Sequence, residues 1–314
     1  SCIINIDETI SGRYPNQGPS ILLEANIPMF ETANSKIFNL IKEGETIEII
    51  DNSIVHKGEN IGDCELLDEN RVKQLLQISY ENIEIELESF IENTLEYAKK
   101  EKGLVTGKIP IPKTKTSFKN KHALVVIRGK DYKADLEAIR SYISEMHPIL
   151  IGVDGGGDAL LDFGYIPHMV VGDMDSISDK CLRETGEIIV HAYPDGRAPG
   201  LERVKKLGLE ATVFPAPGTS EDIAFLLAYG NGADLIVAVG THTNMIDFLE
   251  KGRPGMSSTF LVRLKVGNKL VDAKGVNKLY HSSFKLKYVI GIAIAALIPI
   301  GVITLRHPLF REIM

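Results

Sequence analysis

The fold of the second half of the chain is indicated by Met169-Val170-Val171-Gly172-Asp173-Met174-Asp175-Ser176, where a short apolar strand ends in an acidic loop. Similar apolar runs, at 123–128, 149–153 and 234–239, alternate with stretches of helical pattern such as 132–146. This alternation predicts a parallel α/β sheet. Ligands of such sheets bind beyond the carboxyl ends of the strands, so the loops that follow the strands are the candidate binding site.

Two aspartates in this loop are candidate metal ligands. Asp173 and Asp175 stand two residues apart, so in an extended chain their carboxylates project to the same side. Hard oxygen ligands on one side suit Mg²⁺ that carries a polyphosphate. We therefore predict that Asp173 and Asp175 bind Mg²⁺. Two solvated loop aspartates are the alternative that the spacing alone leaves open.

A glycine-rich turn, Asp154-Gly155-Gly156-Gly157, follows the run at 149–153 and precedes an expected helix at 159–163. Glycines let backbone amides approach a phosphate closely, and a helix N-terminus favours negative charge. The turn is therefore a candidate phosphate-binding loop, with Asp154 as an acidic group beside it. Turn geometry alone is the alternative, because the spacing is not that of the dinucleotide-binding GxGxxG motif.

Two further loops are candidates for ligand binding. In Gly218-Thr219-Ser220-Glu221-Asp222, Thr219 or Ser220 is suited to cap a helix that runs through Tyr229. The acidic residues there either bind the ligand or favour the helix dipole. Gly240-Thr241-His242-Thr243-Asn244 follows the run at 235–239, and its histidine is either structural or a ligand contact. The residues predicted to bind the nucleotide in these loops are Thr219, Ser220, Asp222, Thr241, His242 and Asn244.

In this order the four loops resemble the catalytic domain of thiamin pyrophosphokinase, over residues 121–279. That family moves a pyrophosphate group from ATP to a hydroxyl, and aspartates in such loops hold its Mg²⁺ and its ATP phosphates. The resemblance implies that ATP or another nucleotide is the ligand here and that these places are taken by Asp154, Asp173, Asp175 and Asp222. The loops at 240–244 and 220–222 depart from the family's Gly-Gly-Arg-x-Asp-His and Thr-Thr-Asp segments, so the catalytic residues and the acceptor stay open.

Longer phrases resemble the SteA family of cytokinetic-ring proteins of Gram-positive bacteria. They are Ile10-Ser11-Gly12-Arg13-Tyr14-Pro15-Asn16, His191-Ala192-Tyr193-Pro194-Asp195-Gly196-Arg197-Ala198-Pro199-Gly200, Gly218-Thr219-Ser220-Glu221-Asp222 and Gly255-Met256-Ser257-Ser258-Thr259-Phe260. The resemblance implies a thiamin-pyrophosphokinase-like domain followed by a transmembrane segment near the C-terminus. It also implies a role in cell division and cell separation, through a small membrane protein of the SteB type and regulation of peptidoglycan hydrolysis.

Residues 1–62 are predicted to form a small mixed α/β domain. Its expected elements are a strand at 2–6, a helix at 19–25 and a hairpin with strands at 46–50 and 53–57. The pair Asp51-Asn52 is typical of the tight turn in such a hairpin. Because the chain begins with Ser1 directly before a strand, we expect its natural N-terminus to be missing.

A long amphipathic helix is predicted in region 63–103, because 68–102 has neither proline nor glycine and its apolar residues recur every three or four positions. At 1.5 Å per residue this helix is about 50 Å long, more than the small domain covers. We expect the same helix of a second subunit to cover the stripe, which makes the protein a homodimer. Packing on the next domain is the alternative. The stripe includes Val72, Leu75, Leu87 and Phe90.

Residues 104–121, with two prolines, are expected to be a linker to the thiamin-pyrophosphokinase-like domain at 122–284. The segment 285–306 then contains an uncharged run from Tyr288 to Leu305, close to the roughly 20 residues that span a bilayer. We predict one transmembrane helix at 285–306 and a short tail at 307–314. A buried core helix is the alternative.

The charges beside this run predict how the chain is oriented. The lysines that precede the run outnumber the arginines that follow it, so the positive-inside rule places the bulk of the chain in the cytoplasm. The predicted location is therefore the cell membrane at the division site, with a single pass near the C-terminus.

The composition of the chain restricts the kinds of partner and of metal site that we expect. The 314-residue chain has a net charge of −7, which provides no general basic field, so we predict no nucleic-acid partner. Cys2, Cys64 and Cys181 stand far apart, which argues against a disulfide framework or a zinc site and fits a reducing cytoplasm.

These patterns predict a membrane-anchored cell-division protein that binds Mg²⁺ and a nucleotide or another diphosphate-like ligand, as a scaffold or sensor. The alternative is an active diphosphokinase that transfers pyrophosphate from ATP to an unknown alcohol. A structural protein with a vestigial pocket is a third hypothesis. Turnover separates the first two, because only the enzyme releases AMP from ATP when an acceptor is present.

Overall fold

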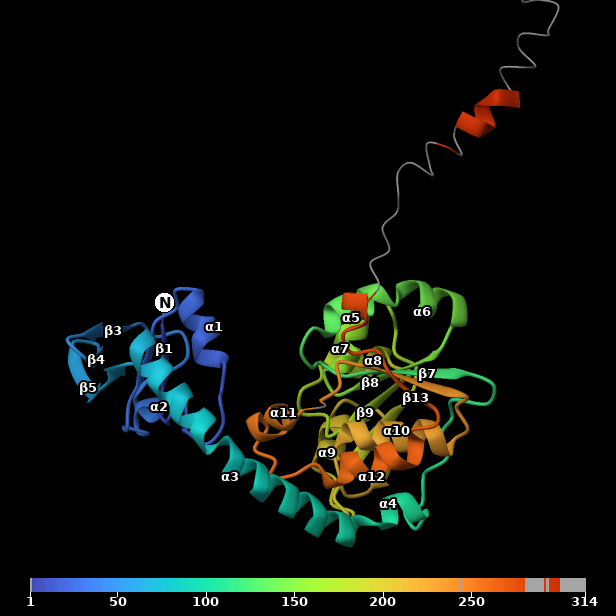
Figure 1. The fold of residues 1–314 in the computed structure, drawn as a ribbon, viewed down its shortest axis with the longest axis horizontal. Helices are drawn as coiled ribbons and strands as arrows, with labels where there is room; N and C mark the ends of the chain where they lie inside the picture. The colour runs from blue at the N-terminus through green and yellow to red at the C-terminus, as the bar shows by residue number, and fades with distance from the viewer. Residues whose placement is uncertain (1, 243, 280–290, 292–293, 300–314) are drawn as a thin grey trace, which may run out of the picture.

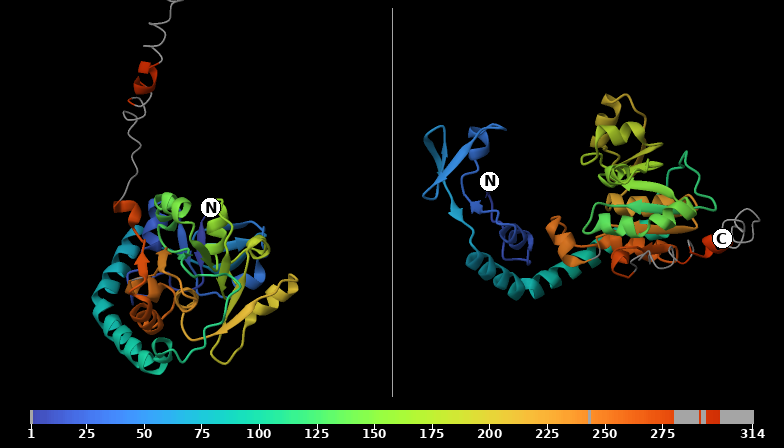
Figure 2. Two further views of the ribbon diagram at one scale, coloured as in Figure 1. Left: turned by 90° about the vertical axis from the view of Figure 1, so that its right-hand side faces the viewer. Right: turned by 90° about the horizontal axis from the view of Figure 1, so that it is seen from above.

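The computed structural model describes residues 2–242, 244–279, 291 and 294–299. Within them the chain forms a small N-terminal domain, one long helix and an α/β domain (Figure 1). Figure 2 shows that the two domains lie at the two ends of the helix, on the same side of it.

The small domain, as far as it is described, holds two three-stranded sheets and two helices. One sheet pairs β1 (Ile3–Asn5) in parallel with β2 (Met29–Glu31), which pairs antiparallel with β6 (Glu65–Leu66). The other sheet is an antiparallel meander of β3 (Ile47–Ile50), β4 (Ser53–His56) and β5 (Glu59–Asp63). The helices are α1 (Gly18–Glu24) and α2 (Ile37–Leu40).

The predicted hairpin is present as β3 and β4. Its turn residues Asp51 and Asn52 both have positive φ angles, 47° and 67°. A two-residue turn of this kind matches the twist of the flanking strands, and Asp and Asn tolerate the left-handed conformation better than most residues. The sequence therefore placed this turn at the right two residues.

Helix α3 (Glu69–Glu101) is the predicted long helix, and the Asp68 side chain caps it by accepting a hydrogen bond from the Arg71 backbone N–H. Its first turns pack on the small domain, where Val72 is buried. Its last turns pack on the α/β domain, where the Phe90 and Phe248 rings lie with centroids 6.1 Å apart. The structure thus has the intramolecular packing that the sequence left open, while the homodimer stays a prediction.

The segment expected to be a linker is fastened to the α/β domain. It begins with α4 (Gly103–Thr106), and the side chains of Leu104 and Phe118 are almost fully buried in the domain core. The Glu187 carboxylate accepts hydrogen bonds from the backbone N–H groups of Lys115 and Thr116. These contacts hold the segment along the domain instead of leaving it free.

The α/β domain is built on a sheet of seven described strands, in which every neighbouring pair is parallel. This confirms the predicted parallel sheet. The strand order is β11-β10-β9-β8-β7-β12-β13. In chain order the strands are β7 (His122–Val126), β8 (Ile149–Val153), β9 (Met169–Gly172), β10 (Ile188–Ala192), β11 (Thr212–Pro215), β12 (Leu235–Val239) and β13 (Leu270–Asp272).

Helices cover both faces of this sheet (Figure 1). Ala123 and Val125 of β7 pack with α10 and α12 on one face, whereas Leu124 and Val126 pack with α5, α6 and α7 on the other. Burying one valine or leucine side chain stabilises the fold by about 1.5–3 kcal/mol, so the apolar strands require both layers. The helices are α5 (Tyr132–Ala138), α6 (Arg140–Met146), α7 (Gly156–Asp162), α8 (Asp179–Glu184), α9 (Pro199–Lys206), α10 (Ser220–Gly230), α11 (Met245–Glu250), α12 (Ser257–Val266) and α13 (Val276–Leu279).

The direction of the chain along the sheet reverses at β7. From β7 the chain proceeds through β8, β9 and β10 to the edge strand β11, and it then returns to β12 on the other side of β7. The carboxyl ends of β7 and β12 therefore form a topological switch point, which is where open α/β sheets bind ligands. The loops that leave these strands touch, because a Cβ on Gly129 would overlap the Gly240 carbonyl.

The predicted transmembrane helix at 285–306 is wrong as far as the structure describes this segment. No helix among the described residues is long and apolar enough to cross a membrane. Within this segment the structure describes residues 291 and 294–299, which are helical. The rest of the predicted span and the tail at 307–314 lie outside the described residues. The prediction of a single-pass location in the cell membrane depended on this helix, so it is wrong for the same reason.

Candidate functional site

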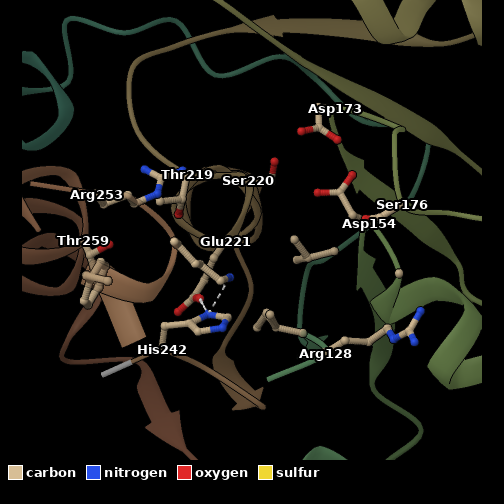
Figure 3. Close-up of a pocket in the computed structure, with 15 residues that line it drawn as sticks. Arg128, Asp154, Asp173, Ser176, Thr219, Ser220, Glu221, His242, Arg253 and Thr259 are labelled. Carbon is tan, nitrogen blue, oxygen red and sulfur yellow. Dashed lines mark hydrogen bonds and ion pairs between the residues drawn. The ribbon is translucent and has the colours of Figure 1, made fainter. Parts of the chain in front are cut away.

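A cavity of about 500 Å³ opens at the switch point, beyond the carboxyl ends of β7, β8, β9 and β12 (Figure 3). The N-terminus of α10 and the segment around α11 close its other side. Its position is the one that the parallel topology predicts for a ligand site. The residues that line it are Ile127, Arg128, Val153, Asp154, Gly155, Asp173, Ser176, Thr219, Ser220, Glu221, His242, Phe248, Lys251, Arg253 and Thr259.

Asp154 is held in place by its neighbours on β9. It follows β8 with a φ of 46°, and its Oδ1 atom accepts a hydrogen bond from the Met174 backbone N–H at 3.1 Å. A Cβ on Gly172 would overlap the Asp154 carboxylate, so only glycine fits at the end of β9. A non-glycine residue at positive φ is strained, and such strain is most often found at binding or catalytic sites.

The carboxylates of Asp154 and Asp173 lie side by side in the cavity (Figure 3). Burial, followed by the negative charge of Asp173, raises the pKa of Asp154 to about 7, although hydrogen bonds from Met174 and Ser220 oppose the change. Two neighbouring carboxylates repel each other when both are ionised, and a divalent cation between them removes that repulsion. The pair is therefore a suitable site for a cation.

The donor set fits Mg²⁺ when it is bound with a phosphate. Among the described residues no group of three or more His, Cys, Asp or Glu side chains converges on one point. Mg²⁺ commonly uses one or two protein carboxylates and takes its remaining ligands from water and substrate phosphates. Asp154 and Asp173 would hold the ion in this way, and the ion would neutralise phosphate charge.

Asp175, the second predicted metal ligand, does not line this cavity. The chain between the two aspartates is not extended, because Met174 has a φ of 68°. Asp175 is exposed and borders a smaller neighbouring cavity, and its backbone N–H donates to Asp173 Oδ1 at 3.0 Å. The sequence argument assumed an extended chain at this point, so it paired Asp173 with Asp175 instead of Asp154.

Of the three predicted residues at the start of α10, two line the cavity and one is buried in the core. Thr219 and Ser220 line the cavity, while Asp222 is fully buried behind them. Asp222 Oδ2 accepts hydrogen bonds from the Thr219 backbone N–H at 3.0 Å and from Ser258 Oγ at 2.8 Å. Asp222 therefore fixes the helix start and its contact with α12, and its carboxylate is not among the groups that line the cavity.

Four other predicted residues also lie away from the cavity lining. A Cβ on Gly156 would overlap the Val126 carbonyl, and a Cβ on Gly157 would lie 2.8 Å from Cys181 Sγ, so these glycines let α7 pack on the sheet. Thr241 is buried and its Oγ1 donates to the Asp272 carboxylate. Asn244 caps α11 by accepting from the Asp247 backbone N–H. Of the glycine turn, only Gly155 lines the cavity.

Glu221, for which the sequence left open ligand binding or a favourable charge at the helix start, is a buried acid that lies beside the predicted His242 in the cavity lining (Figure 3). His242 Nδ1 lies 3.4 Å from Glu221 Oε2 and 3.4 Å from Lys251 Nζ. Burial raises the pKa of Glu221 and lowers the pKa of Lys251. Glu221 Oε1 has no hydrogen-bond partner among the described residues, and its ion pair with Arg263 is long, at 3.8 Å. Asp222 Oδ1, whose residue does not line the cavity, likewise has no hydrogen-bond partner among the described residues.

Three cations were missed. Arg128 directly follows β7, so the rule that selected the other loops would have found it. Lys251 and Arg253 follow α11, and no strand pattern points to that segment. Arg128 lies on the same side as Asp154, against Gly155, whereas Arg253 lies across the cavity from Asp154 and Asp173 (Figure 3). Together with these acids, Lys251 and Arg253 give the cavity the mixed charge that a polyphosphate bound to a divalent cation requires.

A second cavity of about 290 Å³ adjoins the first. The two share Asp173, Ser220 and Arg253, so they form one continuous cleft. The other residues of the smaller cavity are Asp175, His191, Ala192, Tyr193, Pro194, Pro199, Ala216, Pro217 and Gly218.

The C-terminal part of the chain, residues 274–314, matches the family model of the SteA-like C-terminal domain. Over these residues the chain is similar to SteA-like proteins. This match confirms the predicted SteA-like resemblance, and the structure describes residues 274–279, 291 and 294–299 of the SteA-like domain.

Comparisons with solved structures and with curated proteins give two further findings. It is similar to the crystal structure of thiamine pyrophosphokinase from Bacillus subtilis, with 25% sequence identity and a TM-score of 0.29. The match covers 48% of this chain and 60% of that one, so the chain spans less than two thirds of the kinase. No curated protein matches the chain.

Proposed function

We propose that the α/β domain binds a nucleotide, or another ligand with a diphosphate group, together with Mg²⁺. The observation that carries this proposal is the pairing of Asp154 with Asp173 in a cavity whose opposite wall presents Lys251 and Arg253. The acids hold the cation and the basic side chains bind phosphate oxygens. The N-terminus of α10 adds the partial positive charge of a helix end beside Thr219 and Ser220.

The charge states of the cavity support an anionic ligand. Burial lowers the pKa of Lys251, and a bound phosphate would restore its charged form by pairing with it. Mg²⁺ would likewise favour the ionised form of Asp154. Ligand and metal therefore each offset a cost that the empty cavity imposes on its own side chains.

The role in cell division is also part of this proposal. It is supported by the SteA-like C-terminal domain and by the phrases that resemble SteA proteins elsewhere in the chain. In this role the α/β domain acts as a ligand sensor or scaffold, and a small membrane protein of the SteB type is the partner.

A diphosphokinase activity is the second candidate function, and Glu221 is the observation that favours it. A buried carboxylate with a raised pKa beside a phosphate site is suited to accept the proton of an attacking hydroxyl. In that reaction the alcohol oxygen bonds to the β-phosphorus of ATP, AMP leaves, and the proton passes to Glu221. Chromatographic detection of AMP from Mg²⁺–ATP and a panel of alcohols tests for it, and no AMP above the rate without protein would remove this candidate.

Calorimetric titration of the full chain with Mg²⁺ and ADP, ATP or inorganic pyrophosphate tests the binding proposal. We expect wild-type protein to bind and Asp154→Asn to bind at least tenfold more weakly, because one of the two metal carboxylates is lost. Asp162→Asn changes an exposed aspartate of α7 that does not line the cavity, so it is the matched control. No binding by wild type, or equal binding by Asp154→Asn, would overturn the proposal.

A further inference from the structure

The smaller cavity differs in chemistry from the larger one. It is lined by fewer charged side chains, and its wall includes the rigid or small apolar residues Ala192, Pro194, Pro199, Ala216 and Pro217. The charged side chains that line it are the shared Asp173 and Arg253 and the exposed Asp175. Such a wall suits an uncharged organic group, whereas the larger cavity suits a charged one.

His191 keeps this wall uncharged. Its Nε2 atom lies 3.0 Å from the Ala216 carbonyl oxygen, which only accepts hydrogen bonds, so Nε2 carries the proton. Its Nδ1 atom lies 3.3 Å from Ser220 Oγ, whose single hydroxyl proton serves either this nitrogen or the Asp154 carboxylate. Burial lowers the pKa of His191, in agreement with a neutral ring. His191 and Ser220 are therefore in contact where the two cavities adjoin.

Tyr193 presents an aromatic ring at the same cavity. A tight turn holds it, because the Gly196 N–H donates to the Tyr193 carbonyl at 2.8 Å and the Tyr193 N–H donates to the Arg197 carbonyl at 2.9 Å. The Arg197 guanidinium lies 4.8 Å from the ring centroid, and Asp195 holds that guanidinium in turn. Yet the side chain is not used by the fold, since Tyr193 is 54% exposed. A flat, exposed ring that is held in position beside a cavity is a stacking platform.

We propose that the smaller cavity binds a flat, uncharged ring of the ligand, stacked on Tyr193, while the diphosphate and the cation of the same molecule occupy the larger cavity. This assignment rests on the proposed function and specifies the ligand class as a nucleoside diphosphate or a similar ring-bearing diphosphate. The shared residues Asp173, Ser220 and Arg253 lie where the ring is joined to the phosphates. This proposal also gives a role to the segment 191–200, because His191, Ala192, Tyr193, Pro194 and Pro199 line the smaller cavity.

Binding measurements with two kinds of ligand test this inference. Mg²⁺–pyrophosphate reports on the larger cavity alone, and the tightest-binding of ADP, GDP, CDP and UDP reports on both. In titrations of the full chain we expect Tyr193→Ala to weaken the nucleoside diphosphate on the order of tenfold, which is the usual effect of removing one stacking partner. Pyrophosphate should bind Tyr193→Ala and wild type alike.

Tyr193→Phe is the matched control, because it keeps the ring and removes only the hydroxyl, and it should bind the nucleoside diphosphate as wild type does. The inference is overturned if Tyr193→Ala weakens both ligands equally or neither, or if no nucleoside diphosphate binds wild type more tightly than pyrophosphate. If wild type binds none of these ligands, the proposed function fails together with it. Pyrophosphate binding without nucleoside preference removes the ring site alone.

Discussion

The Nδ1 atom of His242 lies 3.4 Å from Oε2 of Glu221, and this contact joins the loop after β12 to the first turn of α10. The acid is buried, with 7% of its surface exposed, and its second oxygen has no hydrogen bond among the described residues. The pair therefore forms a cavity wall whose stability depends on pH.

We expect Glu221→Gln to stabilise the protein increasingly as pH rises. The pKa of Glu221 is raised above its ordinary value of 4.5, chiefly by burial, so the folded state binds more protons than the unfolded state above that pH. Stability from this residue is then present at low pH and lost as pH rises through the folded pKa. Thermal unfolding at pH 5 and pH 8 without ligand is the measurement. A larger gain at pH 5 than at pH 8 would contradict the expected sign.

The two predicted metal ligands should differ in effect. Asp173 lines both cavities and Asp175 only the smaller one, so Asp173→Asn should weaken Mg²⁺–pyrophosphate at least tenfold. Asp175→Asn should leave the affinity within about threefold, because the Asp175 carboxylate does not line the cavity in which Asp154 and Asp173 would hold the cation. Calorimetric titration of both single variants decides the matter. Equal losses would restore the extended pairing that the sequence suggested.

The contact between Phe90 and Phe248 should contribute strongly to stability. Both side chains are almost fully buried, so we expect Phe90→Ala to lower the free energy of unfolding by about 3 kcal/mol. The double variant with Phe248→Ala should lose less than the sum of the two single losses, because the two rings touch. Urea unfolding measures all four proteins. Ile85→Ala, at an exposed position of the same helix, is the control, and a comparable loss there would show that the ring contact is not special.

The homodimer prediction now points to a different face of α3. Phe90 packs within its own chain, but seven large apolar or aromatic side chains of the helix are exposed, and four of them, Tyr80, Leu87, Ile91 and Leu95, follow one another at intervals of four or seven residues and so share one face. We expect Leu87→Glu with Ile91→Glu to convert a dimer into a folded monomer, because neither side chain is needed within the chain. Multi-angle light scattering measures the mass and circular dichroism the fold. A wild-type monomer, or a dimer that persists in the variant, would exclude this face.

The sequence predicted the cavity residues best where they lie in the loop that directly follows a strand. Asp154, Asp173 and His242 lie in loops directly after β8, β9 and β12, so the alternation of strands and helices was enough to place them at the ligand edge. It was least informative where a role depends on distant partners. Asp222 looks like a ligand in sequence, but hydroxyls of α12, thirty-six residues or more away, occupy its carboxylate.

Two other features required the folded chain. Lys251 and Arg253 reach the cavity only because α11 brings the end of its helix back across the sheet edge, and nothing in their local sequence marks that return. The sequence also could not predict what the long helix packs against. A periodic apolar stripe indicates that one face of a helix is covered, but it does not identify the surface that covers it. The structure contains the packing on the next domain that the sequence left as the alternative, through Phe90 and Phe248, and the homodimer stays a prediction.

Helix α3 is attached to the α/β domain at its far end by polar contacts as well as by rings. The Met256 N–H donates to Thr94 Oγ1 at 3.0 Å, and Ser257 Oγ donates to Glu101 Oε2 at 2.6 Å. The next two residues, Ser258 and Thr259, hold the Asp222 carboxylate. Helix α3, with 33 residues and a length of about 50 Å, connects this contact to the small domain. The first turn of α12 therefore anchors both the far end of the long helix and the buried carboxylate at the start of α10, whose first residues line the cavity.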